Sequence, residues 1–73
     1  MKKKLISVIV PIFNEYDTIS IFINKLSKII SSIKKYNFEI IFINDGSNDK
    51  SLDLLLNLKK KFKNIVIIDF SRN

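Results

Sequence analysis

The sequence contains neither cysteine nor histidine. Without cysteine, the chain can form no disulfide scaffold and no thiolate metal site. Without histidine, it lacks the commonest metal ligand and the commonest general base. Any proton transfer by this chain therefore falls to its carboxylates.

Glycine is nearly absent as well, since Gly46 is the single example. Dinucleotide-binding and P-loop sites need several glycines, because backbone N–H groups must approach the phosphates closely. The turn after the first apolar run, Pro11-Ile12-Phe13-Asn14-Glu15, contains none. A nucleotide bound by this chain would therefore be held by side chains and strand-end backbone, with its base in a cleft.

Long apolar runs are missing too. None approaches the roughly 18 residues that a transmembrane helix requires. Lys2 to Lys4 followed by Leu5 to Phe13 imitates the start of a signal peptide, but Pro11 interrupts the run. No small-residue cleavage site follows, so the sequence does not favour a secretory signal.

What remains is a short chain of globular composition, with 73 residues of which 47% are hydrophobic and 27% charged. That length allows one domain or part of one. Much of the net charge of +6 comes from lysines grouped where predicted helices end, such as Lys34-Lys35 and Lys59 to Lys61. We interpret them as solvated residues that complement helix dipoles, with an anionic membrane surface as the alternative. Clustered lysines without interleaved exposed aromatics do not predict a nucleic-acid binder.

Three short apolar runs, near residues 5–10, 38–43 and 65–70, predict buried strands, because they are rich in Val, Ile and Phe and do not alternate with polar residues. Apolar residues recur at helical spacing near 17–35 and near 49–63. Asp17 and Thr18 can cap the first helix and Tyr36-Asn37 can end it.

This order predicts an α/β fold, namely a β-α-β-α-β Rossmann-like unit whose three parallel strands lie in the order 3-2-1. The strand pattern is the one expected when helices cover both faces of a sheet. With only three strands, we expect one sheet edge and part of one face to lack their cover, so the isolated chain should be marginally stable and prone to associate.

All three predicted strands end at the same edge of the sheet, where ligands of open α/β sheets bind. The polar segments 11–15, 44–49 and 71–73 gather there. Asp45 could accept N–H donors from a base edge, either the ring N3–H of uracil or the N1–H and amino group of guanine. Gly46 supplies a permissive backbone for the turn. In the alternative interpretation, these residues only end a strand and cap the next helix, with Asp49 as a cap or first-turn acid.

Three segments in order, each at a strand end, resemble the start of glycosyltransferase family 2 with its GT-A fold. They are Val10 to Glu15, Ile43 to Asp49, and Phe70-Ser71-Arg72-Asn73. The similarity spans essentially the whole chain and is greatest to the polyprenyl-phosphate sugar transferases, which include the dolichyl-phosphate mannosyltransferases and the bactoprenol glucosyltransferases. On this resemblance, residues 1–73 form the N-terminal nucleotide-sugar-binding part of an incomplete GT-A domain.

The resemblance implies site residues only at matching positions. These are Pro11, Phe13, Asn14 and Glu15 in the first segment, with Asp45 and Gly46 in the second. Asn44 stands where many members have Asp, which weakens an acidic-pair interpretation. Arg72 receives no firm role.

Structural interpretations stay open for each residue of the first segment. Pro11 can simply end a strand, and Phe13 can pack at the rim. Asn14 can form a turn through its own side chain, and Glu15 can act as a first-turn acid. A carboxylate at Glu15 could instead bond ribose hydroxyls.

Family members hold Mg²⁺ or Mn²⁺ against the donor diphosphate with a later motif of two aspartates around one residue. This spacing is absent here, so we expect the metal ligands, the catalytic base and the acceptor site beyond Asn73. The resemblance implies an inverting transfer from a UDP- or GDP-linked sugar to an acceptor, most simply a polyprenyl phosphate, at the cytoplasmic face of the cell membrane. We expect these 73 residues alone to be inactive.

One alternative is a small β-α-β-α-β binding or signalling module without transferase activity. A response-regulator receiver needs an acidic pair after its first strand and a phosphoacceptor Asp after its third. Residues 11–15 offer one acid and residues 71–73 none, which argues against that module.

Overall fold

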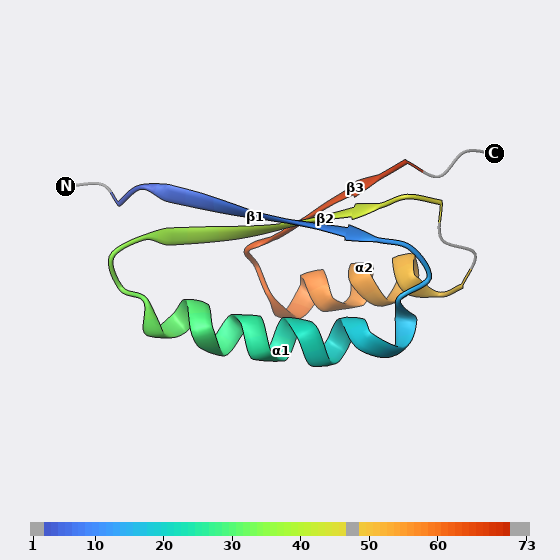
Figure 1. Ribbon diagram of the computed structural model, residues 1–73, viewed down its shortest axis with the longest axis horizontal. Coiled ribbons are helices and arrows are strands. Elements are labelled where there is room, and N and C mark those ends of the chain that lie inside the picture. Colours follow the sequence, from blue (N-terminus) through green and yellow to red (C-terminus); the bar gives the residue numbers. More distant parts are fainter. Residues whose placement is uncertain (1–2, 47–48, 71–73) are drawn as a thin grey trace.

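The computed structural model describes residues 3–46 and 49–70 and contains five elements. In chain order they are β1 Leu5–Ile12, α1 Tyr16–Ser32, β2 Asn37–Asn44, α2 Ser51–Lys61 and β3 Ile65–Asp69. The β-α-β-α-β order predicted from apolar spacing is confirmed (Figure 1). Both helices are shorter than the apolar pattern suggested, and β1 and β2 are longer.

The three strands form one parallel sheet in the order β1-β2-β3, which is the predicted 3-2-1 order read from the other edge. The pairing runs from Leu5 opposite Asn37 to Ile12 opposite Asn44, and β3 joins β2 with Ile65 opposite Ile40. β2 is therefore the central strand, and β1 and β3 are edges.

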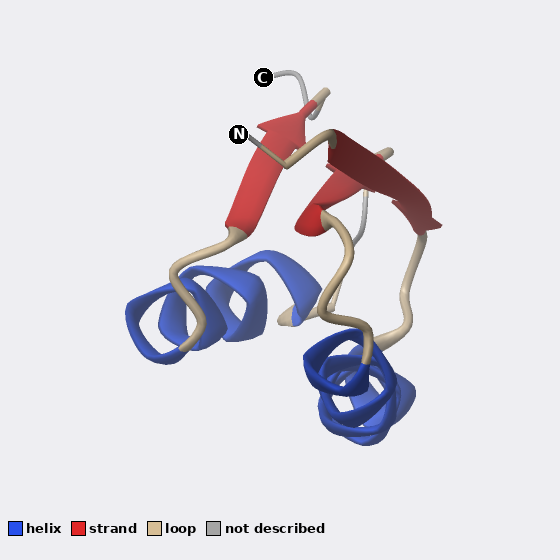
Figure 2. Ribbon diagram, turned by 90° about the vertical axis from the view of Figure 1, so that its left-hand side faces the viewer, coloured by secondary structure: helices blue, strands red, loops and turns tan. Residues whose placement is uncertain are grey.

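Both helices lie on the same face of the sheet, as Figures 1 and 2 show from two directions. Crossovers between parallel strands are right-handed in nearly all proteins. Both crossovers here step across the sheet in the same direction, so two crossovers of one hand leave their helices on one side. The expectation of cover on both faces is therefore not met by the described residues. The expectation that part of one face of the sheet lacks helices is confirmed. Among the described residues, the whole of that face lacks them.

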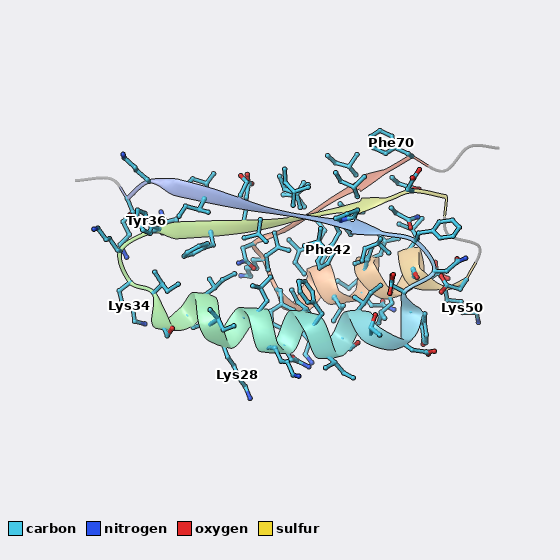
Figure 3. All side chains as sticks on the ribbon, in the orientation of Figure 1. Lys28, Lys34, Tyr36, Phe42, Lys50 and Phe70 are labelled. Carbon is cyan, nitrogen blue, oxygen red and sulfur yellow. The ribbon has the colours of Figure 1, made fainter. Side chains whose placement is uncertain are left out.

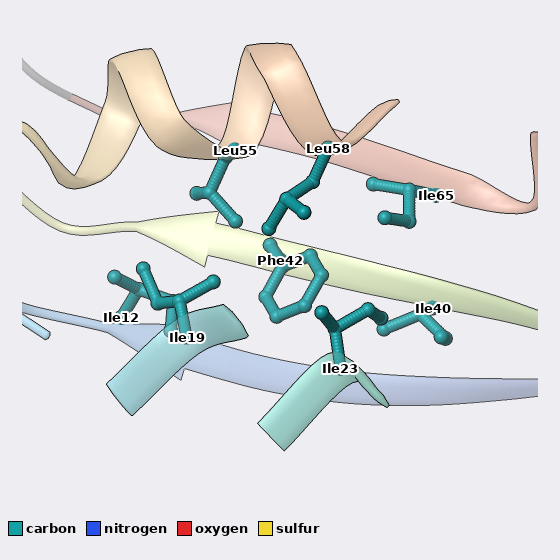
Figure 4. Close-up of a cluster of buried hydrophobic side chains, with 8 residues drawn as sticks. All are labelled: Ile12, Ile19, Ile23, Ile40, Phe42, Leu55, Leu58 and Ile65. Carbon is teal, nitrogen blue, oxygen red and sulfur yellow. The ribbon is translucent and has the colours of Figure 1, made fainter. Parts of the chain in front are cut away.

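The core lies between the sheet and the two helices (Figure 4). β2 contributes most centrally, because alternate side chains of a strand point to the same face and Ile40 and Phe42 are fully buried. The buried hydrophobic cluster is Ile12, Ile19, Ile23, Ile40, Phe42, Leu55, Leu58 and Ile65. Burial of this kind stabilises by about 25 cal/mol per Å² of apolar surface, so the eight side chains anchor both helices to the sheet.

The opposite face of the sheet is apolar and open to solvent. Ile9 is 62% exposed and Leu5 is 59% exposed, and the register places Ile9 beside Ile41 and Val66 on this face. Figure 3 shows Phe42 between sheet and helices and Phe70 on the opposite side. We call this surface the open sheet face, defined by Leu5, Ile9, Ile41, Val66 and Ile68. A polar pair interrupts it, since the Ser7 hydroxyl donates a hydrogen bond to the Glu39 carboxylate.

The helix ends differ from the sequence prediction in two respects. Asp17 and Thr18 do not cap α1, because they already lie in its first turn and Glu15 occupies the N-cap without a side-chain cap bond. The helix ends at Ser32, so Lys34 and Lys35 lie in the connection to β2 and α1 has no basic residue in its last turn. In α2, by contrast, Lys59, Lys60 and Lys61 complement the helix dipole as predicted.

Candidate functional site

The carboxyl ends of β1 and β2 bring the two sequence-predicted segments together. The last register pair of these strands is Ile12 with Asn44. One residue further on, the backbone N–H of Asp45 donates a hydrogen bond of 3.0 Å to the carbonyl of Ile12. The loop after β1 and the loop after β2 therefore leave the sheet side by side.

In the first loop, the structure places the four predicted residues at the surface, all of them exposed. Pro11 lies in β1, an edge strand, where a missing N–H is tolerated. Phe13 is 56% exposed, so its ring is available as a stacking surface. Asn14 has a φ of 52°, a left-handed conformation in which Asn is several-fold enriched.

Glu15 begins the first turn of α1. Its carbonyl accepts hydrogen bonds from the N–H groups of Thr18 and Ile19, at 3.0 and 3.2 Å. Its carboxylate accepts the Thr18 hydroxyl at 3.2 Å and remains exposed. The local turn therefore fixes the backbone of Glu15 and leaves carboxylate capacity for a ligand hydroxyl.

A groove of about 220 Å³ runs between the outer edge of β1 and α1. It is lined mainly by apolar residues and includes two of the predicted site residues, Pro11 and Glu15. Its lining consists of Val10, Pro11, Ile12, Glu15, Thr18, Ile19 and Phe22. Asp45 does not line it, so this groove unites only part of the predicted site.

In the second loop, Asp45 is exposed directly after the central strand. Gly46 follows with a φ of 73°, and a Cβ added there would meet nothing within 4 Å. Glycine is therefore favoured at this position by backbone conformation and not by crowding. Ser47 and Asn48 lie outside the described residues, as does the predicted third segment, Ser71-Arg72-Asn73.

Unlike the exposed Asp45, Asn44 is buried. Its side chain is 1% exposed, and its amide nitrogen donates a hydrogen bond of 3.1 Å to the carboxylate of Asp69. The bond joins the carboxyl ends of β2 and β3. The side-chain amide of Asn44 supplies a hydrogen-bond donor. An Asp at this position would be ionised at neutral pH and could only accept.

Asp49 makes contacts that the sequence did not reveal. Its carboxylate accepts the backbone N–H of Ser51, the first residue of α2, at 2.9 Å, although the N-cap position itself is Lys50, one residue later than the sequence suggested. The same carboxylate also accepts the backbone N–H of Tyr16 at 3.3 Å, at the start of α1. A single side chain therefore caps the N-termini of both helices.

The electrostatics of Asp49 follow from these donors. The hydrogen bond from the Ser51 hydroxyl lowers the pKa of the Asp49 carboxyl below its ordinary value, against an opposing effect of desolvation. Backbone N–H groups, including those of Ser51 and Tyr16, lower the pKa further. A second hollow, of about 520 Å³, borders this carboxylate and is lined by Tyr16, Asp17, Asp49 and Lys50.

The described residues do not form a divalent-cation site. Within 3–46 and 49–70, no group of three or more acidic side chains is placed to hold a metal ion. Nor is either helix in these ranges long and apolar enough to cross a membrane. The residues that a diphosphate-bound cation would need are thus not assembled in this part of the chain.

Comparison with known proteins gives a consistent result. Residues 7–73 match the family described as Glycosyl transferase family 2. A poly(ribitol-phosphate) beta-glucosyltransferase of Bacillus spizizenii is 38% identical over 68 residues, which cover 93% of this chain and 10% of that protein. A putative glycosyltransferase of Bacillus subtilis, CsbB, is 40% identical over 73 residues, covering 100% of this chain and 22% of that protein.

A third relative, the prophage bactoprenol glucosyl transferase homolog of Escherichia coli, is 40% identical over 68 residues. That match covers 93% of this chain and 22% of the relative. The chain thus spans only between 10% and 22% of the length of these three proteins.

Proposed function

The chain belongs to glycosyl transferase family 2, and from that premise we propose that it forms the donor-nucleotide-binding part of an inverting glycosyltransferase. The observation that carries the proposal is the meeting of two loops at the carboxyl edge of the sheet. The hydrogen bond from the Asp45 N–H to the Ile12 carbonyl sets them side by side. Ligands of parallel sheets bind at this edge.

Within the proposed site, each residue has a role that fits its surroundings. The exposed carboxylate of Asp45 accepts ring N–H donors of uracil or guanine, and that of Glu15 accepts ribose hydroxyls. Phe13 offers its exposed ring to the base. Pro11, Asn14 and Gly46 shape the loops through the edge strand, the left-handed φ of 52° and the φ of 73°.

In the proposed reaction, an acceptor oxygen attacks the anomeric carbon of the donor sugar. The bond from that carbon to the diphosphate oxygen breaks, its electron pair leaves with the nucleoside diphosphate, and the configuration at carbon inverts. The residues of this chain bind and orient the nucleotide so that this displacement can occur elsewhere in the protein.

The charge distribution supports a requirement for a cation. Six of the seven acidic residues lie at the carboxyl end of the sheet, at strand ends or in first helical turns: Glu15, Asp17, Asp45, Asp49, Asp53 and Asp69. An anionic diphosphate approaching this end needs counter-charge. Mg²⁺ or Mn²⁺, which the family resemblance implies, would supply that charge when held by residues outside this chain.

For the acceptor, we propose a polyprenyl phosphate at the cytoplasmic face of a membrane. Support comes from relatives whose names specify bactoprenol, among them the Escherichia coli homolog. The name of the Bacillus spizizenii relative specifies a poly(ribitol phosphate) instead. A complete transferase that contains this chain is incubated with labelled UDP- or GDP-sugar and each acceptor in turn. Transfer to the polyol polymer without transfer to polyprenyl phosphate would overturn this choice.

The nucleotide site is tested by substituting Asp45. Because charge-assisted hydrogen bonds contribute about 1.5–3 kcal/mol, Asp45→Ala in a complete transferase that contains this chain should weaken the binding of UDP or GDP by roughly 10- to 150-fold. Asp45→Asn should have a smaller effect, because its amide oxygen still accepts. Titration calorimetry measures both variants.

Asp53→Ala is the matched control, because it removes an acid from the first turn of α2 without touching either loop. It should bind as the parent does. Equal binding of both nucleotides by the parent and Asp45→Ala would show that the loop after β2 is only a structural turn.

A further inference from the structure

The N-termini of α1 and α2 lie at the same end of the molecule (Figure 1), and a network of hydrogen bonds joins them. Three bonds cross from the loop after β1 to the segment that starts α2. The Glu15 N–H donates to the Ser51 hydroxyl at 3.1 Å, and the Tyr16 N–H donates to the Asp49 carboxylate at 3.3 Å. In the reverse direction, the Asp49 N–H donates to the Asn14 side-chain oxygen at 3.2 Å.

At the centre of this network, the Ser51 hydroxyl both donates and accepts a hydrogen bond. The Ser51 hydroxyl donates its hydrogen to the Asp49 carboxylate at 2.5 Å and accepts the Glu15 N–H on its oxygen. Ser51 is 0% exposed, so no water replaces these partners. A buried hydroxyl with both functions engaged holds its neighbours in one geometry.

We propose that Asp49 and Ser51 are positioning residues for the donor nucleotide, acting as a clamp that fixes the loop carrying Phe13 and Glu15 relative to the loop carrying Asp45. The inference rests on the proposed function, because it assigns the clamp to that same site. Neither Asp49 nor Ser51 needs to contact the ligand.

The clamp holds backbone that lies beyond the end of the sheet. Asp45 is tied to the end of β1 by one backbone hydrogen bond, whereas Glu15 and Tyr16 lie beyond the strand, where sheet pairing no longer holds them. Their N–H groups are held by the side chains of Ser51 and Asp49. A loop fixed before binding loses less conformational freedom when the nucleotide arrives, which strengthens binding without a new contact.

Three substitutions at Asp49 separate this role from helix capping. A serine hydroxyl can accept the N–H two residues further on, as the Asp49 carboxylate does, so Asp49→Ser retains an acceptor for the Ser51 N–H, but its single oxygen on a shorter side chain cannot also reach Tyr16. Asp49→Asn retains an acceptor oxygen on a side chain of the original length. Asp49→Ala retains neither bond. Asp53→Asn is the matched control, since it neutralises an acid in the first turn of the same helix.

Nucleotide affinity, the stability of the protein and the amide exchange of Tyr16 are measured for each variant. We expect Asp49→Ser and Asp49→Ala to bind UDP or GDP roughly three- to ten-fold more weakly than the parent, the effect of one lost hydrogen bond. Asp49→Asn and Asp53→Asn should remain within about two-fold of the parent. Unfolding should order the variants differently, with Asp49→Ser more stable than Asp49→Ala. The Tyr16 amide should exchange faster in Asp49→Ser.

The outcomes distinguish this inference from the proposed function. A parent that binds neither nucleotide overturns both the proposed site and the role of the clamp in it. If the parent binds and Asp49→Ser binds equally well, the site stands and the clamp is only a helix cap. A loss of affinity that follows stability across the series, with Asp49→Ser close to Asp49→Asn, also overturns the positioning role.

Discussion

At the residue scale, Asn44 and Asp45 are neighbours at the end of β2 but have different surroundings. Successive residues of a strand point to opposite faces. Asn44 therefore points toward the helices, buried and bonded to Asp69, while Asp45 follows it into the exposed loop. The departure from the family pattern at position 44 consequently leaves the proposed base contact of Asp45 untouched.

Asn44→Asp should destabilise the protein at neutral pH. It replaces the amide donor with a carboxylate beside that of Asp69, at a position that is 1% exposed. Losing this part-buried hydrogen bond to a charged group costs about 1.5–3 kcal/mol. Urea unfolding at pH 7 measures the change, and the deficit should shrink at acidic pH, where one carboxyl of the pair is protonated.

Asp69→Asn combined with Asn44→Asp is the control, because it restores a donor and an acceptor in exchanged positions. The double variant should recover most of the lost stability. A single Asn44→Asp variant as stable as the parent at pH 7 would contradict the structural role of this pair.

At the element scale, the start of α1 depends on the segment that begins α2 for its side-chain hydrogen bonds. α1 has no side-chain cap from its own N-cap residue, and the Asp49 carboxylate from the segment before α2 bonds its first N–H group. The helix dipoles place partial positive charge at both N-termini, so ionised Asp49 is favoured there. Hydrogen bonds from the Ser51 hydroxyl, and then from backbone N–H groups that include those of Ser51 and Tyr16, lower the pKa of the Asp49 carboxyl in the same direction.

The pH dependence of stability follows from that shift. Because the folded state lowers the pKa of Asp49, its contribution is fully present above the ordinary pKa of aspartate, about 3.9. The contribution is lost as the pH falls through the lower, folded-state pKa. Asp49→Asn, which cannot titrate, should therefore lose less stability than the parent when urea midpoints at pH 7 and pH 3 are compared. Equal losses in both proteins would contradict the coupling.

At the scale of the whole molecule, residues 3–46 and 49–70 cover the sheet on one side only. Parallel sheets occur almost always with both faces covered. Here both helices lie on one face (Figure 2), and the open sheet face presents apolar side chains of all three strands, with Ile9 and Val66 exposed and Ile41 partly buried. Contiguous apolar surface of this kind favours association.

The 73-residue chain in isolation should associate through the open sheet face. Sedimentation velocity over a range of concentrations measures this, and Ile9→Lys should shift the protein toward monomer, because a charge on the face must be desolvated in the complex. Ile21→Lys is the matched control, since Ile21 is comparably exposed at 59% but lies on α1. Cooperative unfolding as a monomer, without concentration dependence, would show the prediction to be wrong.

The sequence by itself determined the order of the elements, the parallel sheet and most of the core, because apolar periodicity is a property of neighbouring residues. It placed Asp45 at a strand end for the same reason. Helical spacing alone did not distinguish buried Ile23 from Ile29, which is 58% exposed, because exposure depends on which face has a partner.

Only the tertiary structure decided that both helices share one face and that a single carboxylate caps them both. The bond between Asp49 and Tyr16 joins residues 33 positions apart, and the bond between Ser51 and Glu15 joins residues 36 apart. No local pattern encodes such a pairing. It arises when two crossovers of the same hand carry both helix N-termini to one end of the sheet, where their unpaired N–H groups meet a shared acceptor.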